Sequence, residues 1–296
     1  MTIADAPHPA IAIATCAAHP DLDAEGRLLL DALRERGAAA EPAVWNEPAA
    51  RAWHDYDLVV LRSTWDYTFA LADFLAWARA IGPQRLLNAP DVVAWNADKR
   101  YLADLARAGL ATIATEHLPP GAAFAPPPGR FVVKPAVGAG ARGAQVFDDD
   151  RHEQARAHVQ QLHGGGHDVL VQPYLDAVDG DEGEIALIFI DGELSHAMHK
   201  GPLLALDRPA IETGFRPEQM STARPAADVV ALGRAAHALV QERFGRPLYA
   251  RVDVLRDGAG VPAVLELELI EPSLFLDFVP GSAQALARAI VARLPG

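Results

Sequence analysis

Residues 131–147 place a lysine and a glycine-rich loop between two short apolar runs, and this combination narrows the folds open to the chain. Phe131 to Val133 have the composition of a buried strand, with Lys134 at its end, and Ala144 to Phe147 resemble a second strand. The loop between them contains Gly138, Gly140 and Gly143. A lysine beside a mobile glycine loop can neutralise and enclose the phosphates of a nucleoside triphosphate.

The same loop spells G-x-G-x-x-G, a pattern that also occurs in dinucleotide-binding turns. That fingerprint requires a helix to open at its last glycine. Here a short apolar run and then Asp148, Asp149 and Asp150 follow, which is typical of a hairpin. A nicotinamide-dependent oxidoreductase therefore stays open only as a disfavoured alternative.

The composition limits the partners and the compartment. Lys and Arg number 26 against 39 Asp and Glu, a formal charge of −13, which argues against nucleic acid or an anionic membrane as partner. Half of the 296 residues are hydrophobic, enough for two or three folded lobes. Cys16 is the only cysteine, which fits a reducing cytoplasm. We expect no signal peptide and no membrane span, because no long uncharged apolar run occurs.

The first part of the chain alternates apolar runs with helical patterns. Strands are expected at Ala10–Thr15, Val44–Trp45, Leu58–Leu61 and Leu86–Leu87. Helices are expected at Arg27–Arg36 and Ala72–Ile81. Strands that alternate with helices in this way predict a small parallel sheet.

The rest of the chain is richer in strands. After a helix at Asp98–Ala108 and a proline-rich connection at Pro119–Pro128, strands are expected at Phe131–Val133, Ala144–Phe147, Val169–Gln172, Ile185–Ile190, Leu194–His199, Tyr249–Leu255 and Ala263–Leu269. Asp191-Gly192 signals a hairpin. A long helix is expected at Asp228–Phe244, and Ser282 is expected to cap a last helix through Leu294. The tract from His163 to His167 is interpreted as a flexible loop rather than a metal site.

Two late strands carry charged side chains on one face. Residues i and i+2 of a strand share a face, so Glu266 and Glu268 point the same way, as do Arg251 and Asp253. A solvated face of an edge strand is one explanation. Carboxylates gathered on an apolar strand otherwise need a cation, and magnesium prefers oxygen ligands. The matching pair and the upstream lysines favour the magnesium site.

Five spaced features occur in one order from Asn96 to the C-terminus. They are Lys99 after an Asn-Ala-Asp turn, Lys134 before the glycine loop, Gln172–Leu175 before an acidic turn, Lys200 at a hairpin end, and the late carboxylates. In this order the chain resembles the ATP-grasp carboxylate–amine ligases. The flanks LRSTWDYTFALADFLAW, LLNAPDVVAWNADKRYL and LELELIEPSLFLDF further resemble the O-ureido-serine cyclo-ligase group, which makes cycloserine.

The resemblance implies an ATP-grasp fold, with an N-terminal α/β lobe and two α+β lobes that clasp ATP. The implied boundaries are residues 1–95 for the substrate lobe, 96–172 for the central lobe with the glycine loop, and 173–296 for the lobe with the metal site. The implied cofactors are ATP and magnesium, with two ions expected.

The resemblance also implies a role for each matching residue. Lys99 and Lys134 would hold the α- and β-phosphates, and Lys200 would approach the γ-phosphate. The loop with Gly138, Gly140 and Gly143 would close over the phosphates, and Gln172, Pro173, Tyr174 and Leu175 would meet adenine. Glu184 would bind the ribose hydroxyls, with Glu182 as the alternative. Asp253, Glu266 and Glu268 would bind magnesium, and Arg251 would stabilise the tetrahedral intermediate.

Two points are specific to this sequence. The family usually shows Glu-x-Asn at the second metal position, whereas this chain has Glu266-Leu267-Glu268. Five residues follow the strand at Leu58–Leu61, where ligands sit in open α/β sheets: Ser63, Thr64, Trp65, Asp66 and Tyr67. Their hydroxyls, carboxylate and aromatic rings suit a zwitterionic amino acid, although a helix cap with two core aromatics would explain them too.

The implied activity is that of an ATP-dependent ligase, which activates a carboxylate as an acyl phosphate for attack by an amine and releases ADP and phosphate. In the cyclo-ligase group both groups belong to one molecule, so proximity favours ring closure. The alternatives are an intermolecular amino-acid or peptide ligase of the glutathione-synthetase type, a nucleotide-binding regulatory module without turnover, and a phosphotransferase. The expected partner is a small amino-acid-like molecule, and a homo-oligomer is allowed for.

Overall fold

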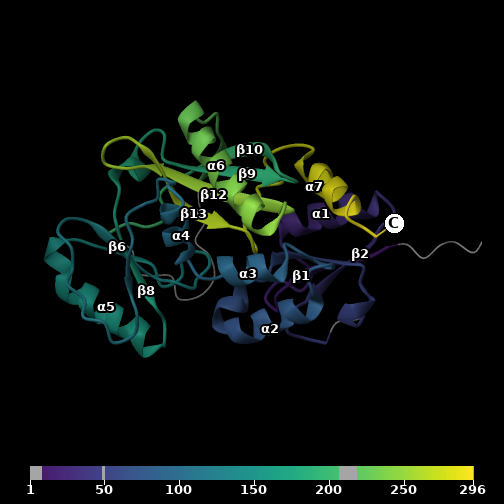
Figure 1. Cartoon of the computed structure of the whole chain (residues 1–296), viewed down its shortest axis with the longest axis horizontal. Coiled ribbons are helices and arrows are strands. Elements are labelled where there is room, and N and C mark those ends of the chain that lie inside the picture. Colours follow the sequence, from purple (N-terminus) through teal and green to yellow (C-terminus); the bar gives the residue numbers. More distant parts are fainter. Residues whose placement is uncertain (1–8, 49–50, 207–218, 296) are drawn as a thin grey trace, which may run out of the picture.

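The computed structural model describes residues 9–48, 51–206 and 219–295. Three sheets form the molecule, each built from one stretch of the chain. In Figure 1 the N-terminal sheet lies at the lower right, the central sheet at the left, and the C-terminal sheet at the top. Within the described residues, no helix is long and apolar enough to cross a membrane.

The N-terminal sheet is parallel, as predicted, with strand order β2-β1-β3-β4. Its strands are β1 (Ala10–Thr15), β2 (Ala39–Val44), β3 (Leu58–Ser63) and β4 (Leu86–Leu87). Its helices are α1 (Ala24–Arg34), α2 (Leu71–Ile81) and α3 (Pro90–Asn96), the last of which was not predicted. Helix α1 begins earlier than predicted, because the Asp23 carboxylate accepts a hydrogen bond from the Gly26 N–H and caps the helix.

The central sheet is antiparallel, with strand order β5-β8-β6-β7. Its strands are β5 (Glu116–Leu118), β6 (Phe131–Pro135), β7 (Gln145–Phe147) and β8 (Val169–Pro173). The pairing of β6 with β7 confirms the predicted hairpin around the glycine loop. A dinucleotide-binding helix therefore does not open at Gly143. Helix α4 (Tyr101–Arg107) precedes this sheet and is shorter than predicted.

The C-terminal sheet has the order β11-β10-β9-β12-β13 and is also antiparallel. Its strands are β9 (Glu184–Ile190), β10 (Glu193–Lys200), β11 (Met220–Thr222), β12 (Tyr249–Arg256) and β13 (Pro262–Glu268). Asp191 and Gly192 have φ values of 50° and 89°, which confirms the predicted hairpin turn. Helix α6 (Ala227–Phe244) covers this sheet, and the long helix was predicted within one residue.

Two predictions about helix ends are wrong. Helix α5 (His152–Gly164) was missed, and it extends into the histidine–glycine tract that was predicted to be a loop. Helix α7 (Ser282–Val291) has Gly281, not Ser282, at its N-cap position. The single Ser282 hydroxyl proton instead points toward the carbonyls of Leu276 and Val279, at 3.0 and 2.7 Å, so this side chain secures the preceding loop.

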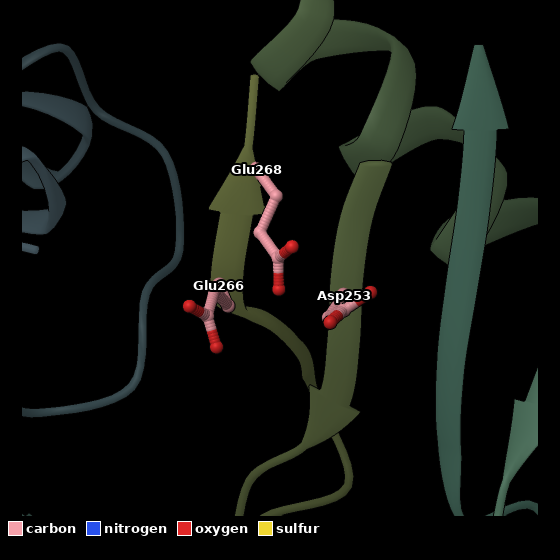
Figure 2. Close-up of side chains that lie close together, drawn as sticks. All are labelled: Asp253, Glu266 and Glu268. Carbon is pink, nitrogen blue, oxygen red and sulfur yellow. The ribbon is translucent and has the colours of Figure 1, made fainter. Parts of the chain in front are cut away.

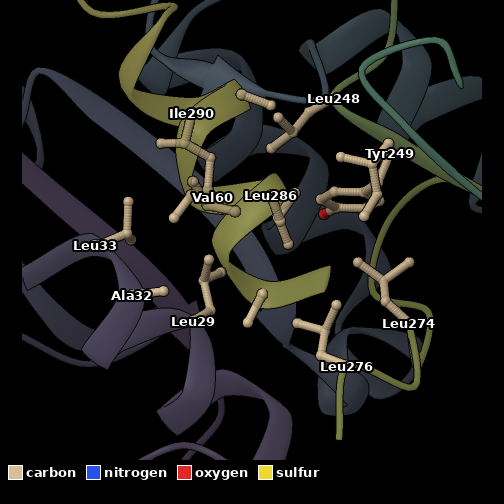
Figure 3. Packing of buried hydrophobic residues seen from close by; sticks show 14 of the residues in the cluster. Leu29, Ala32, Leu33, Val60, Leu248, Tyr249, Leu274, Leu276, Leu286 and Ile290 are labelled. Atoms are coloured by element: carbon tan, nitrogen blue, oxygen red, sulfur yellow. The ribbon is translucent and has the colours of Figure 1, made fainter. Parts of the chain in front are cut away.

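The N-terminal and C-terminal sheets share one hydrophobic core. Helix α7 packs against α1, and Figure 3 shows Leu286 of α7 in the same cluster as Leu29 of α1 and Val60 of β3. Tyr249 of β12 belongs to this cluster and donates its hydroxyl proton toward the carbonyls of Leu61 and Ile270. The two ends of the chain therefore form one packed unit.

The central sheet has a core of its own. It packs against α5 through residues such as Phe131, Val133 and Val159, which belong to a separate cluster. The fold thus joins a large unit, made from both ends of the chain, to a smaller one that carries the glycine loop.

Candidate active site

A cavity of about 680 Å³ is lined by residues from all three sheets and their loops. The sequence contains three lysines, Lys99, Lys134 and Lys200, and all of them line this cavity. Arg251 adds a fourth positive charge to the wall. An acidic protein therefore gathers its lysines at one place, as an anionic ligand such as a nucleotide requires.

The predicted metal residues meet on neighbouring strands. In the pairing of β12 with β13, Asp253 lies opposite Glu266 and Arg251 lies opposite Glu268. Oxygen atoms of Asp253, Glu266 and Glu268 lie within 4.8 Å of one another, and Figure 2 shows the three carboxylates on one side of the strand pair. A donor set made only of carboxylate oxygens suits magnesium, a hard cation. These side chains therefore fit the metal that the sequence predicted.

Buried asparagines hold β13 in place. The Asn96 side chain donates to the Leu267 carbonyl at 2.8 Å and accepts from the Leu269 N–H at 2.7 Å. Asn88 donates to the carbonyls of Tyr249 and Leu269 at 3.0 and 2.8 Å. Because these bonds satisfy backbone groups at the end of the strand pair, the carboxylates project from a fixed backbone.

Cations already pair with all three of these carboxylates and with the neighbouring Glu184. Lys200 Nζ lies 2.5 Å from Glu184 and 3.1 Å from Asp253, and Lys99 Nζ lies 3.2 Å from Glu266. Arg251 pairs with Asp253 at 2.9 Å and also with Glu268. Among the cations in this cluster, Lys134 alone has no carboxylate within 4.0 Å in the described part of the chain. Lys134 is therefore the cation best placed to receive a phosphate.

The pKa shifts show where charge is under-compensated. Burial favours the neutral acid at Asp253, but Arg251 and Lys200 outweigh it and lower the pKa of that carboxyl to about 2. Burial raises the pKa of Glu268 to about 7, because Arg251 offsets it only in part. Burial, together with Lys99, also lowers the pKa of Lys134. A phosphate at Lys134 and a cation at Glu268 would each restore the favoured charged state.

Most of the residues predicted to bind the nucleotide line the cavity, but Gly143 does not. Gly138 and Gly140 line the cavity together with the run from Gln172 to Leu175. The Gln172 side chain is buried and donates to Thr115 at 2.9 Å, so it supports the strand end and leaves only its backbone for a ligand. Gly143 does not line the cavity. Its φ of 70° turns the loop back against Pro135, and its carbonyl contacts the buried His158 ring at 2.8 Å.

The two candidates for the ribose hydroxyls are clearly separated. Glu184 lines the cavity beside Lys200. Glu182 does not line it and instead forms an ion pair with Arg256 at 2.5 Å. The structure therefore brings only Glu184 to the nucleotide end of the site.

The five predicted substrate residues are also divided. Trp65 and Tyr67 line the cavity, whereas Ser63, Thr64 and Asp66 do not. The Ser63 hydroxyl donates to Asp23 at 2.8 Å, and Asp66 accepts from the Trp45 indole N–H at 2.6 Å. These two polar side chains hold the loop in place, so the substrate would meet mainly its aromatic members.

Comparison with known proteins assigns the family. Residues 11–88 match the family described as "D-cycloserine synthetase DcsG, N-terminal domain". The chain is also 36% identical to the "Cycloserine biosynthesis protein DcsG" of Streptomyces lavendulae, over 96% of this chain and 98% of that relative. The chain belongs to the DcsG family.

Solved structures extend this likeness to the DcsG-family fold. A crystal structure of D-cycloserine synthetase DcsG has a TM-score of 0.87 at 34% identity, covering 97% of this chain and 100% of that one. The ATP-grasp ligase PsnB, solved with its minimal precursor, Mg and ADP, has a TM-score of 0.59 at 18% identity, covering 97% of each chain. The predicted ATP-grasp fold is thereby confirmed, and the DcsG-family chain is an ATP-dependent ligase that forms a C–N bond.

The DcsG-family site includes three cavity residues that the sequence did not reveal: Glu25, Arg142 and Glu271. Glu25 pairs with Arg62 at 3.4 Å and accepts from the Leu274 N–H at 2.8 Å. Burial raises the pKa of Glu271 to about 8, and the nearby charge of Glu268 adds to this effect. Each of these residues sits far in sequence from its neighbours, so no local pattern marks it.

Arg142 joins the glycine loop to the substrate side of the DcsG-family site. Its guanidinium donates to the Trp65 carbonyl and to the Thr68 hydroxyl, the latter at 2.8 Å. It also lies over the Phe69 ring, 4.6 Å from the centroid. The loop that would cover the phosphates thus rests directly on the segment that would meet the amino acid.

Proposed function

We propose that this ligase closes an amide ring within a single amino-acid substrate, and that O-ureido-serine is this substrate. The observation that carries the proposal is one cavity lined by the three lysines, by Glu266 and Glu268 of the carboxylate cluster, and by Trp65 and Tyr67. The names of the DcsG relatives support the cycloserine product. When the activated carboxylate and the attacking nitrogen belong to one molecule, the reaction needs no second amine substrate.

The residues suggest how the reaction would proceed. The substrate carboxylate attacks the γ-phosphorus of ATP, the bond to the β-phosphate oxygen breaks, and ADP leaves. The nitrogen bonded to the side-chain oxygen of the same molecule then attacks the acyl phosphate and gives up its proton, and phosphate departs. For cycloserine to form, the bond between that nitrogen and the carbamoyl group must also break, with water accepting the carbamoyl group as carbamate. Lys134 and Lys200 would offset phosphate charge, and Arg251 would stabilise the tetrahedral intermediate. Asp253, Glu266 and Glu268 would hold magnesium, whose charge offsets that of the transferred phosphoryl group.

We expect ADP, phosphate and a cyclic amide to appear together when the enzyme is given ATP, magnesium and O-ureido-serine alone. The lysines and the carboxylate cluster would lie around the γ-phosphoryl group of ATP, and transfer of that group would leave ADP. Chromatography of the nucleotides, with mass spectrometry of the amino-acid products, measures both. Formation of AMP would exclude an acyl phosphate. ADP formed only after a separate amine is added would identify an intermolecular ligase.

Replacing Lys134 with alanine is expected to weaken ATP binding by about 1.5–3 kcal/mol, the range for a lost charge-assisted hydrogen bond. The basis is that Lys134 is half-buried in the cavity wall and has no carboxylate partner among the described residues. Calorimetric titration with a non-hydrolysable ATP analogue gives the affinity. The exposed Arg85→Ala variant is the matched control, since its side chain lies away from the cavity. Equal affinities for both variants would remove Lys134 from the nucleotide site.

Several finer assignments stay proposals. The division into three lobes is supported by the three separate sheets, and the proposed boundaries at residues 95 and 172 fall within α3 and near the end of β8. Binding of magnesium is supported by the carboxylate cluster and by the Mg and ADP held by PsnB, and a second ion remains a prediction. A cytoplasmic location and a homo-oligomer remain predictions.

A further inference from the structure

Glu271 is a buried acid in the cavity wall that lacks a cation. Only 8% of its surface is exposed, and it lines the cavity after the end of β13. In the described part of the chain, no Lys, Arg or His nitrogen forms an ion pair with its carboxylate, and no other residue's side chain donates a hydrogen bond to it. Three other glutamates that line the cavity, Glu25, Glu266 and Glu268, are each paired with a cation.

A buried carboxylate without a nearby cation lowers the stability of a folded protein. Burying a charge without a partner costs several kcal/mol, so without a ligand the Glu271 carboxyl favours its neutral acid, and a cationic ligand group would stabilise the ionised form. Lys99 and Arg142 act on Glu271 only from a distance, and each has its own closer partners. Glu266 and Glu268 lie near enough to oppose the Glu271 charge. The missing counter-charge would therefore come from a cationic ligand group in the cavity.

The position of Glu271 indicates which ligand carries that charge. Its backbone carbonyl accepts a hydrogen bond from the Trp65 indole N–H at 3.2 Å, which fixes Glu271 beside the predicted substrate segment. It also follows Glu268 by three residues, close to the carboxylate cluster where phosphoryl transfer would occur. In an amino acid, the ammonium and carboxyl groups are attached to one carbon. A group that binds the ammonium must therefore lie next to the place where the carboxyl reacts, as Glu271 does.

We propose that Glu271 binds the α-ammonium group of the amino-acid substrate. It would thereby select amino acids over carboxylic acids that lack an ammonium group. The proposal rests on the proposed function above. In the proposed ring closure the α-amine takes no part in bond formation, so its positive charge is available throughout the reaction. Glu25 is a weaker candidate, because Arg62 and the Leu274 N–H already satisfy its carboxylate.

The test compares O-ureido-serine with its desamino analogue, which has hydrogen in place of the α-amine. Glu271→Gln keeps the size of the side chain and removes its charge. We expect this variant to raise KM for O-ureido-serine by about 10- to 100-fold, the range for a charge-assisted bond, with little change in kcat. The KM of the desamino analogue should be the same for the variant and the wild type. Glu271→Asp should retain part of the preference for the amino compound.

The exposed Glu193→Gln variant, which lies outside the cavity on β10, serves as the matched control, and thermal melting verifies that each variant is folded. An unchanged KM for O-ureido-serine in folded Glu271→Gln would overturn the proposal. So would an equal loss of kcat for both compounds, since it would assign Glu271 to proton transfer at the attacking nitrogen. The proposed function is tested separately by whether the wild-type enzyme converts O-ureido-serine at all. That result does not depend on the comparison between variants.

Discussion

Replacing Glu266 with glutamine is expected to stop phosphate release while the protein remains folded. Glu266 pairs with Lys99 at 3.2 Å and belongs to the cluster whose oxygens lie within 4.8 Å of one another. Glutamine keeps the size of the side chain and the strand pairing with Asp253, but it removes one of the negative charges that would hold magnesium. Loss of a single electrostatic contact to a transition state typically costs about a hundredfold or more in rate. Phosphate release at limiting magnesium measures the effect.

The control for this experiment is Glu242→Gln, the same change at an exposed position of α6. It should retain wild-type phosphate release. The Glu266 assignment would fail if folded Glu266→Gln released phosphate at a rate near that of Glu242→Gln. Recovery of activity at high magnesium would support a weakened metal site, because mass action can offset a lower affinity.

Truncating Leu286 to alanine is expected to lower the free energy of unfolding by about 2–5 kcal/mol, the range for removing a buried leucine side chain. Leu286 lies in α7 near the C-terminus and is fully buried in the core that α7 shares with α1. All tryptophans of the sequence lie between Trp45 and Trp95. Tryptophan fluorescence during urea unfolding therefore reports mainly on the N-terminal sheet.

If the two ends of the chain share one core, they should unfold together. The substitution near the C-terminus should shift the fluorescence transition of the N-terminal part to lower urea concentration. Val261→Ala, at a residue that is 49% exposed in the turn after β12, is the control and should stay within about 0.5 kcal/mol of the wild type. A wild-type fluorescence transition in Leu286→Ala would mean that the two ends of the chain unfold independently.

The metal face could be predicted because strand geometry is local. Alternation alone places Glu266 with Glu268 and Arg251 with Asp253, and the pairing of β12 with β13 brings the two pairs together as expected. Likewise, the apolar run before Lys134 and the acidic run after the glycine loop were enough to predict the hairpin of β6 and β7.

Contacts between distant segments could not be predicted in this way. Glu271 meets Trp65 across a separation of 206 residues, and Arg142 meets the same segment across 77. No periodicity in one part of the sequence encodes such contacts. Helix α5 was missed for another reason, since its sequence is mostly polar. Ala155, Val159 and Leu162 do carry helical spacing and bury one face, and they are the signal that could have revealed it.

The confinement of every lysine to one cavity has a consequence for chemical labelling. Apart from the terminal amine of the chain, an acylating reagent finds amines only at Lys99, Lys134 and Lys200. The pKa of Lys134 is lowered by burial, so at neutral pH this side chain supplies more of the nucleophilic free amine than an ordinary lysine would. Dyes, cross-linkers and immobilising resins that couple to lysine would therefore modify the active-site cavity and inactivate this ligase.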